Sequence, residues 1–74
     1  MNMNIDDANE LLTKKRYLTE HEVAAVTGIA VSTLRNDRHL RRGIPYLKVG
    51  KRSIRYMTPD ITGYMESLRI DPNK

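Results

Sequence analysis

The sequence contains no cysteine, no tryptophan and no phenylalanine. Without cysteine, neither a disulfide nor a thiolate–metal site can stabilise the fold, and a reducing compartment is favoured. The core must therefore be built from Val, Leu, Ile, Met and Tyr. The 74 residues predict one domain with a modest core and a stability of roughly 3–5 kcal/mol.

Long hydrophobic runs and targeting signals are also lacking. Residues 1–7 are polar and acidic, whereas a secretory signal needs a basic start and about 7–15 apolar residues. The longest uncharged stretch runs from Val23 up to Arg35 and is too short to span a bilayer. We expect a soluble, cytoplasmic protein with no membrane partner.

No constellation of residues indicates chemistry. The two histidines, His21 and His39, fall in separate predicted helices with no third ligand at metal-binding spacing. There is no Ser/His/Asp grouping, no glycine-rich phosphate loop and no pair of catalytic carboxylates. We therefore expect no enzymatic activity, no metal, no cofactor and no small-molecule ligand.

Positive charge, in contrast, is concentrated in one segment. From Arg35 to Tyr56 there are eight basic residues and one acidic residue, a net charge of +7, whereas the rest of the chain carries a net −3. Such a distribution gives a fold one positive side, which attracts polyanions by electrostatic steering and counterion release.

A capping box begins the first predicted helix of the domain, at about 19–27. Thr19 is expected to cap the backbone N–H of Glu22, while the Glu22 carboxylate reaches back to Thr19. Gly28 then supplies the left-handed residue that ends the helix.

A second helix is expected at about 31–41, and the tight turn at Gly28 makes the pair a candidate helix-turn-helix. The second helix of such a motif can lie in the major groove, where arginine reads guanine and asparagine reads adenine. The alternative is an ordinary helix pair with a solvated polar face. Asp37 is expected to pair with Arg41, four residues on, in preference to contacting a cytosine. The candidate DNA-binding residues of this helix are Ser32, Thr33, Arg35, Asn36, Arg38 and His39.

Alternating residues predict a β-hairpin at 46–57. A four-residue loop would place Val49 opposite Ile54 and Lys48 opposite Arg55, with apolar and basic residues on separate faces, whereas a two-residue loop would mix the faces. Lys48 and Arg55, placed opposite each other, would repel, and this unfavourable pair indicates that both side chains contact phosphates. The alternative is that the charges protect a sheet edge against aggregation. The candidate DNA-binding residues of the hairpin are Lys48, Lys51, Arg52 and Arg55.

A last helix is predicted at 58–69, with Thr58 as N-cap, Pro59 at the first helical position and a core-facing stripe. The stripe consists of Ile61, Tyr64, Met65 and Leu68. Residues 1–16 read as an arm, either a frayed terminus, which we favour, or a short helix. The domain proper then covers 17–70, followed by a tail at 71–74.

Several segments, in this order, resemble the excisionase/AlpA-like winged helix-turn-helix proteins over residues 17–68. They are LTEHEVAAVTGI at Leu18–Ile29, STL at Ser32–Leu34, RGIP at Arg42–Pro45, KVG at Lys48–Gly50 and IRY at Ile54–Tyr56. Members of this family are small phage and mobile-element DNA binders, similar in their DNA-binding domain to MerR regulators. The chain departs from many members at Ala30, where they carry Ser or Thr, and at Asn36–Asp37, where they carry an aromatic residue.

The resemblance implies a mainly α-helical winged helix-turn-helix fold and sequence-specific binding to double-stranded DNA. The protein would act as an excisionase or as a transcriptional regulator at the nucleoid of a bacterial cell, with integrase or RNA polymerase as further partners. We expect a monomer or weak self-association on DNA. The alternative is a protein-interaction adaptor whose basic side binds an acidic partner such as a recombinase or polymerase. Binding to structured RNA is less favoured, because aromatic platforms for unpaired bases are lacking.

Overall fold

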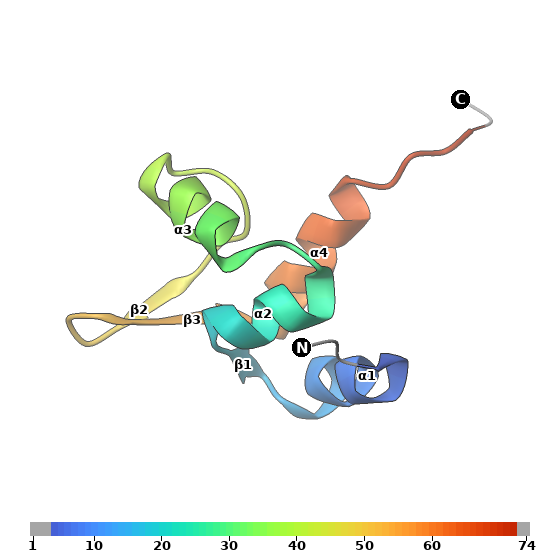
Figure 1. Ribbon diagram of the computed structural model, residues 1–74, viewed down its shortest axis with the longest axis horizontal. Coiled ribbons are helices and arrows are strands. Elements are labelled where there is room, and N and C mark those ends of the chain that lie inside the picture. Colours follow the sequence, from blue (N-terminus) through green and yellow to red (C-terminus); the bar gives the residue numbers. More distant parts are fainter. Residues whose placement is uncertain (1–3, 73–74) are drawn as a thin grey trace.

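The computed structural model describes residues 4–72, which form four helices and a three-stranded antiparallel sheet (Figure 1). The elements are α1 (Ile5–Lys14), β1 (Tyr17–Leu18), α2 (Glu20–Thr27), α3 (Val31–His39), β2 (Leu47–Val49), β3 (Ser53–Met57) and α4 (Thr58–Ser67). The strand order is β1-β3-β2. The β2–β3 hairpin projects from one side of the small α/β domain, whereas the chain after α4 extends from the other.

The N-terminal arm contains a helix, so the frayed terminus that we favoured is wrong and the short helix is confirmed. Asn4 caps α1 by accepting the backbone N–H of Asp7 at 2.8 Å. Acidic residues in the first turn and Lys14 in the last turn complement the helix dipole. Leu11 and Leu12 pack against the domain core, which holds the helix in place.

The capping box of α2 is confirmed. The Thr19 hydroxyl accepts the backbone N–H of Glu22 at 3.2 Å, and the Glu22 carboxylate accepts the backbone N–H of Thr19 at 3.0 Å. Gly28 ends the helix with a φ of +79°, as the sequence predicts. Only residues 29 and 30 then separate this glycine from α3, so the two helices are joined by a tight turn.

Helix α3 is shorter than expected, ending at His39 rather than residue 41. Ala30 precedes it and provides no side-chain cap. Arg41 has a left-handed φ of +56°, which ends the helical path. Leu34 is buried, and Val31 and Arg38 are half-buried on the same face, as their spacing predicts.

The hairpin has a different register from the predicted one. Val49 pairs with Ser53, Lys48 with Ile54 and Leu47 with Arg55, across a three-residue loop rather than four. Lys48 and Arg55 therefore lie on opposite faces, and the repulsion expected between them is absent.

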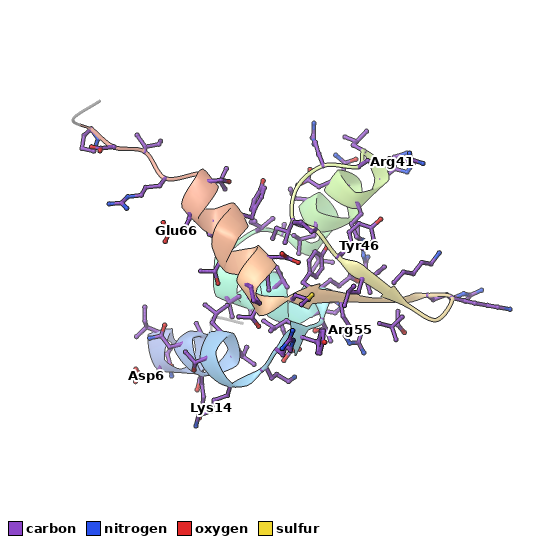
Figure 2. The ribbon with its side chains drawn as sticks, turned by 180° about the vertical axis from the view of Figure 1, so that it is seen from behind. Asp6, Lys14, Arg41, Tyr46, Arg55 and Glu66 are labelled. Atoms are coloured by element: carbon purple, nitrogen blue, oxygen red, sulfur yellow. The ribbon has the colours of Figure 1, made fainter. Side chains whose placement is uncertain are left out.

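The physical reason is the packing of two tyrosines. Tyr56 is buried at 1% exposure, and its ring centroid lies 6.3 Å from that of Tyr46. Residues that alternate along a strand share a face, so Tyr46, Ile54 and Tyr56 form the inner face of the sheet. Figure 2 shows Tyr46 and Arg55 on opposite sides of the hairpin. Leu47 and Val49 consequently lie on the outer face, where they are exposed.

Strand β1 was not predicted from the sequence. Its two residues pair with β3, Tyr17 opposite Met57 and Leu18 opposite Tyr56. The core lies between this sheet and the helices. It consists of Leu18, Val23, Leu34, Ile44, Tyr56 and Ile61, each at most 4% exposed.

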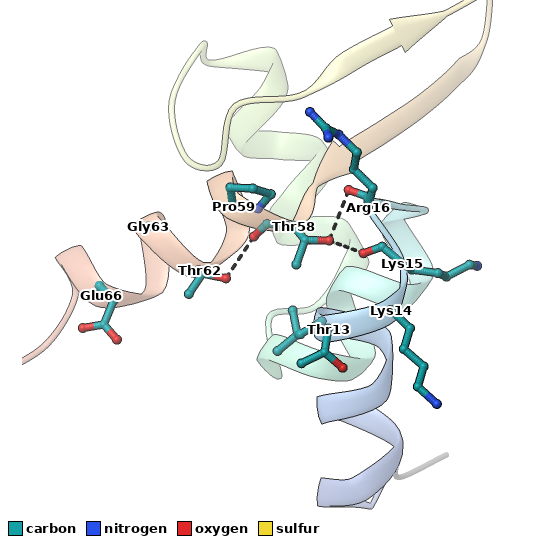
Figure 3. Close-up of a pocket in the computed structure, with 10 residues that line it drawn as sticks. Thr13, Lys14, Lys15, Arg16, Thr58, Pro59, Thr62, Gly63 and Glu66 are labelled. Carbon is teal, nitrogen blue, oxygen red and sulfur yellow. Dashed lines mark hydrogen bonds between the residues drawn. The ribbon is translucent and has the colours of Figure 1, made fainter.

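Helix α4 begins as predicted at residue 58 but is capped differently. Met57 is the capping residue, and Thr58 is already helical. The Thr58 hydroxyl donates to the carbonyl oxygens of Lys15 and Arg16, which ties α4 to the segment after α1 (Figure 3). This tertiary bond takes the hydroxyl away from the capping role.

The predicted apolar stripe of α4 is only half correct. Ile61 is buried and Tyr64 is half-buried, but Met65 and Leu68 are exposed at 38% and 53%. The helix ends at Ser67, two residues before the predicted end at 69. Its last turn lies beyond the core. No helix within residues 4–72 is long and apolar enough to cross a membrane.

Candidate functional site

Four arginines of the basic segment line an open groove between the helices and the hairpin. The groove has a volume of about 410 Å³ and is formed by the start of α2, by α3, by the hairpin tip and by strand β3. We call it the arginine groove. Its lining residues are Thr19, Glu20, His21, Arg35, Arg38, Arg52, Ser53, Ile54 and Arg55.

Strand β1 ends before it reaches this part of β3. It pairs only with residues 56 and 57, so the edge of β3 at residues 53–55 has no neighbouring strand on that side. The first turn of α2 and two side chains of α3 face this edge across the groove. The two-residue length of β1 is therefore what leaves the groove open.

Glu20 is the hub of the arginine groove. Arg35 donates to Glu20 Oε1 from Nη2 at 2.6 Å and from Nε at 3.1 Å. Arg38 donates from Nη2 to Oε2 at 2.9 Å. The Glu20 side chain is only 17% exposed. One carboxylate therefore binds two guanidinium groups of α3 and links the start of α2 to α3.

These bonds keep Glu20 ionised. The hydrogen bond from Arg35 contributes most to lowering the pKa of Glu20, which falls from 4.5 to about 2 although partial burial opposes the change. The hydrogen bond from Arg38 and the positive charges of both arginines lower this pKa further. Glu20 is thus an anion throughout the physiological pH range.

Arg38 is held inside the domain. Its Nη1 donates to the Tyr56 hydroxyl at 2.7 Å, and its guanidinium lies 5.9 Å from the ring centroids of both Tyr46 and Tyr56. The side chain is 15% exposed. Among the predicted DNA-binding residues of α3, Arg38 is therefore the one that connects the helix to the sheet.

The other predicted residues of α3 point outward. They are Ser32, Thr33, Arg35, Asn36 and His39, and all are exposed. Arg35 remains 58% exposed although Glu20 binds it. The helix therefore presents a polar outer face with one arginine whose orientation is already fixed.

None of the four predicted hairpin residues has a counterion among residues 4–72, and three of them are exposed. Lys48, Lys51 and Arg52 are exposed, and no carboxylate of residues 4–72 lies within ion-pair distance of them. Arg55 differs, because it is half-buried and donates to the carbonyl oxygen of Ile54 at 2.8 Å.

Asp37 pairs with Arg42 rather than with Arg41. The Asp37 carboxylate accepts from Arg42 Nε at 3.0 Å. The chain turns back at Gly43, whose φ is +86° and where an added Cβ would lie 2.9 Å from Asp37 Cβ. This turn brings Arg42 to Asp37, whereas Arg41 is left exposed at the end of α3 (Figure 2).

Sequence reasoning missed Glu20. An acidic residue in the first turn of a helix is ordinarily explained by the helix dipole, and 15 residues separate Glu20 from Arg35. No local spacing indicates such a pair. The nearest signal is that Glu20 and Arg35 occupy the two helices of the candidate motif, which must pack against each other.

A second cavity lies between the end of α1 and the start of α4, with a volume of about 670 Å³ (Figure 3). Its two lysines and Thr58 already have partners. Lys14 pairs with Glu10 and Lys15 with Glu22, while Thr58 donates to backbone carbonyl oxygens. The arginine groove gathers four arginines, one of which, Arg52, is exposed and unpaired among the described residues, so it is the better candidate site.

No protein family matches this chain, and neither a curated protein nor a solved structure shows significant similarity to it. The function is therefore inferred from the arginine groove, the outer face of α3 and the hairpin.

Proposed function

We propose that this protein binds double-stranded DNA sequence-specifically through a winged helix-turn-helix. In this proposal α2 and α3 are the two helices of the motif, α3 enters the major groove, and the β2–β3 hairpin is the wing. The observation that carries it is that Arg35 on the outer face of α3 and the exposed, unpaired Arg52 of the hairpin line the same groove.

The dimensions and chemistry of α3 support this assignment. The major groove of B-DNA is about 12 Å wide and admits a single helix. Along α3 the outward residues Ser32, Arg35, Asn36 and His39 are hydrogen-bonding groups, and none of them is needed in the core. Arginine and asparagine are the side chains best suited to bidentate contacts with guanine and adenine.

The hairpin supports it through its charges. A cation that already has a counterion must exchange it to bind a phosphate, whereas Lys48, Lys51 and Arg52 have none to lose. Each phosphate neutralised by such a residue releases condensed ions from the DNA. The three cations are exposed in the observed register, so their availability to phosphate does not depend on the predicted cross-strand repulsion.

The resemblance to excisionase/AlpA-like proteins specifies the biological role within this proposal. The protein would serve a phage or mobile element as an excisionase or as a transcriptional regulator, in either case by binding its own DNA site. Selecting that site from a random library, and locating it next to an attachment site or a promoter, distinguishes the two roles.

A titration of labelled random-sequence duplex at several salt concentrations tests the proposal. Replacing Lys51 and Arg52 by alanine should weaken binding and lower the log–log salt slope by about 2, since each lost phosphate contact contributes about 0.9. The variant K14A/R69A removes the same charge from exposed positions outside the arginine groove. Equal slopes for the two double variants would contradict the assignment of the wing.

A second candidate function is protein recognition, and the outer face of the sheet favours it. Tyr17, Leu47 and Val49 are all exposed there, between 40% and 53%. The candidate is an adaptor that binds a recombinase or polymerase. If V49S abolishes binding to such a partner but leaves DNA affinity unchanged, the two functions use separate surfaces.

A further inference from the structure

Glu20 binds Arg35 by one edge only. The bonds involve Nε and Nη2 of the guanidinium group, and no bond within residues 4–72 uses Nη1. A guanidinium group has five N–H donors in a fixed plane. The terminal edge, formed by Nη1 and the second hydrogen of Nη2, is therefore available while Glu20 remains bound.

The terminal edge is the one that matches a base. Arginine recognises guanine by two parallel hydrogen bonds to O6 and N7. A flexible arginine loses side-chain entropy when it makes such a contact, which weakens binding by about two- to tenfold for each immobilised side chain. Glu20 already orders Arg35. The Arg35 side chain is 58% exposed and belongs to the surface of α3 that is proposed to bind DNA.

Glu20 is itself fixed. It lies in the first turn of α2, next to the capping box, and its second oxygen is held by Arg38, which is anchored on Tyr56. The chain of contacts runs from the buried Tyr56 through Arg38 and Glu20 to Arg35. The orientation of Arg35 is thus set by the sheet rather than by its own rotamer preferences.

The same carboxylate disfavours phosphate. Glu20 is the one carboxylate among the residues that line the arginine groove, and it offsets one of the four arginine charges there. The groove therefore attracts a phosphate backbone less strongly than it would without Glu20.

We propose that Glu20 is a specificity-determining positioning residue: it holds Arg35 by the Nε edge, presents the terminal edge to a guanine, and penalises non-specific phosphate contacts. This inference rests on the proposed DNA-binding function and deepens it. Glu20 makes no base contact itself and acts through Arg35.

The test compares two carboxylates of the same helix turn. E20Q removes the charge that holds Arg35, whereas E22Q removes the charge that pairs with Lys15 at 2.7 Å, outside the arginine groove. The two side chains are similarly exposed, at 17% and 22%. Glutamine also satisfies a capping box, so E22Q is a matched control.

The measurement is base preference at every position of the bound site, obtained by selection from a random duplex library. R35A first identifies the position that Arg35 reads. E20Q should lower guanine preference at that position by about two- to tenfold, the factor for one side chain no longer pre-ordered, and leave other positions unchanged. Its affinity for random duplex should rise a few-fold at low salt. E22Q should retain the wild-type preference.

E20D separates orientation from charge, and it covers the case in which E20Q is too unstable to assay. It keeps the negative charge but withdraws it by one methylene group. The expected result is the same loss of preference at the Arg35 position without the rise in random-duplex affinity.

Three results would overturn the inference. Unchanged preference in both Glu20 variants would make the contact purely structural. A loss spread evenly over all positions would indicate a general disturbance of α3. A loss as large in E22Q would trace the effect to net charge. If the wild-type protein shows no duplex binding, the proposed function itself fails, which is a different outcome from wild-type binding with an inert Glu20.

Discussion

The basic side chains of this domain fall into two groups that differ in what already binds them. Arg35 and Arg38 on α3 share the Glu20 carboxylate, and Arg38 is bound to the sheet as well. On the hairpin, Lys48 and Lys51 have no counterion within the described chain. A count of positive charges treats the two groups alike, although Arg38 is part of the fold, Arg35 keeps only its terminal edge for a ligand, and the hairpin lysines are fully available.

The difference shows that the net charge of a segment does not say how many of its side chains are available to a ligand. The segment from Arg35 to Tyr56 carries a net +7, but its inner arginines are committed to contacts that position elements. If the comparison is correct, substitutions in the inner group should change stability, and substitutions on the hairpin should change only electrostatics.

The largest effect is expected for R38M. The substitution keeps much of the apolar stem but leaves Glu20 with one partner and the Tyr56 hydroxyl with none. Removing one member of a largely buried charge pair should lower the free energy of unfolding by about 2–4 kcal/mol. Urea denaturation of R38M measures this loss. K48M, a control on the hairpin, should stay within about 0.5 kcal/mol of wild type.

A smaller effect is expected from acid. Because the pKa of Glu20 in the folded state is lowered from 4.5 to about 2, its contribution is complete above pH 4.5 and disappears as the pH falls toward 2. Wild type should therefore lose on the order of 2–3 kcal/mol more than E20Q over this range. Parallel stability curves for the two proteins from pH 6 to pH 3 would refute the assignment.

Y56F should have a smaller effect still. It removes the acceptor of the Arg38 Nη1 hydrogen bond without creating a cavity, so a loss of about 1 kcal/mol is expected. Y46F removes a hydroxyl from a side chain that is 43% exposed and should be nearly neutral. Thermal denaturation of the two variants side by side provides the comparison.

The smallest effect on stability is expected for K51A/R52A. Both side chains are exposed at the hairpin tip, so the free energy of unfolding should change by less than about 0.5 kcal/mol. A marked destabilisation would mean that the hairpin cations belong to the fold, and the distinction between the two groups would disappear.

The parts of the fold that follow from local rules were predictable. The capping box at Thr19, the left-handed Gly28 and the inward face of α3 at Leu34 each depend on residues within one or two helical turns. The predicted hairpin was also present, since alternation and a turn glycine are local signals. The arm was more ordered than expected because its helix packs against the core.

The parts that failed depend on distant contacts. The register is set by Tyr46 packing on Tyr56, and a shift of one residue exchanges the faces of a strand. Thr58 does not cap α4 because its hydroxyl meets carbonyl oxygens more than 40 residues away. Asp37 pairs with Arg42 because of the turn at Gly43. The spacing of residues along the chain predicts none of these three contacts.

The candidate site shows the same division. The sequence indicated the exposed residues of α3 and the cations of the hairpin, because composition and periodicity reveal outward positions. It did not indicate that Glu20 orders Arg35, nor that Arg38 faces inward as a connection to Tyr56. Those roles arise only when α2, α3 and β3 meet.

The outer position of Leu47 and Val49 has a consequence for the protein at high concentration. Strand β2 is an edge of the sheet, and an edge with exposed apolar side chains is a template for pairing with another chain. Its short length of three residues and the charge of Lys48 between the two apolar positions limit such pairing. We therefore expect self-association at high concentration to start at this strand.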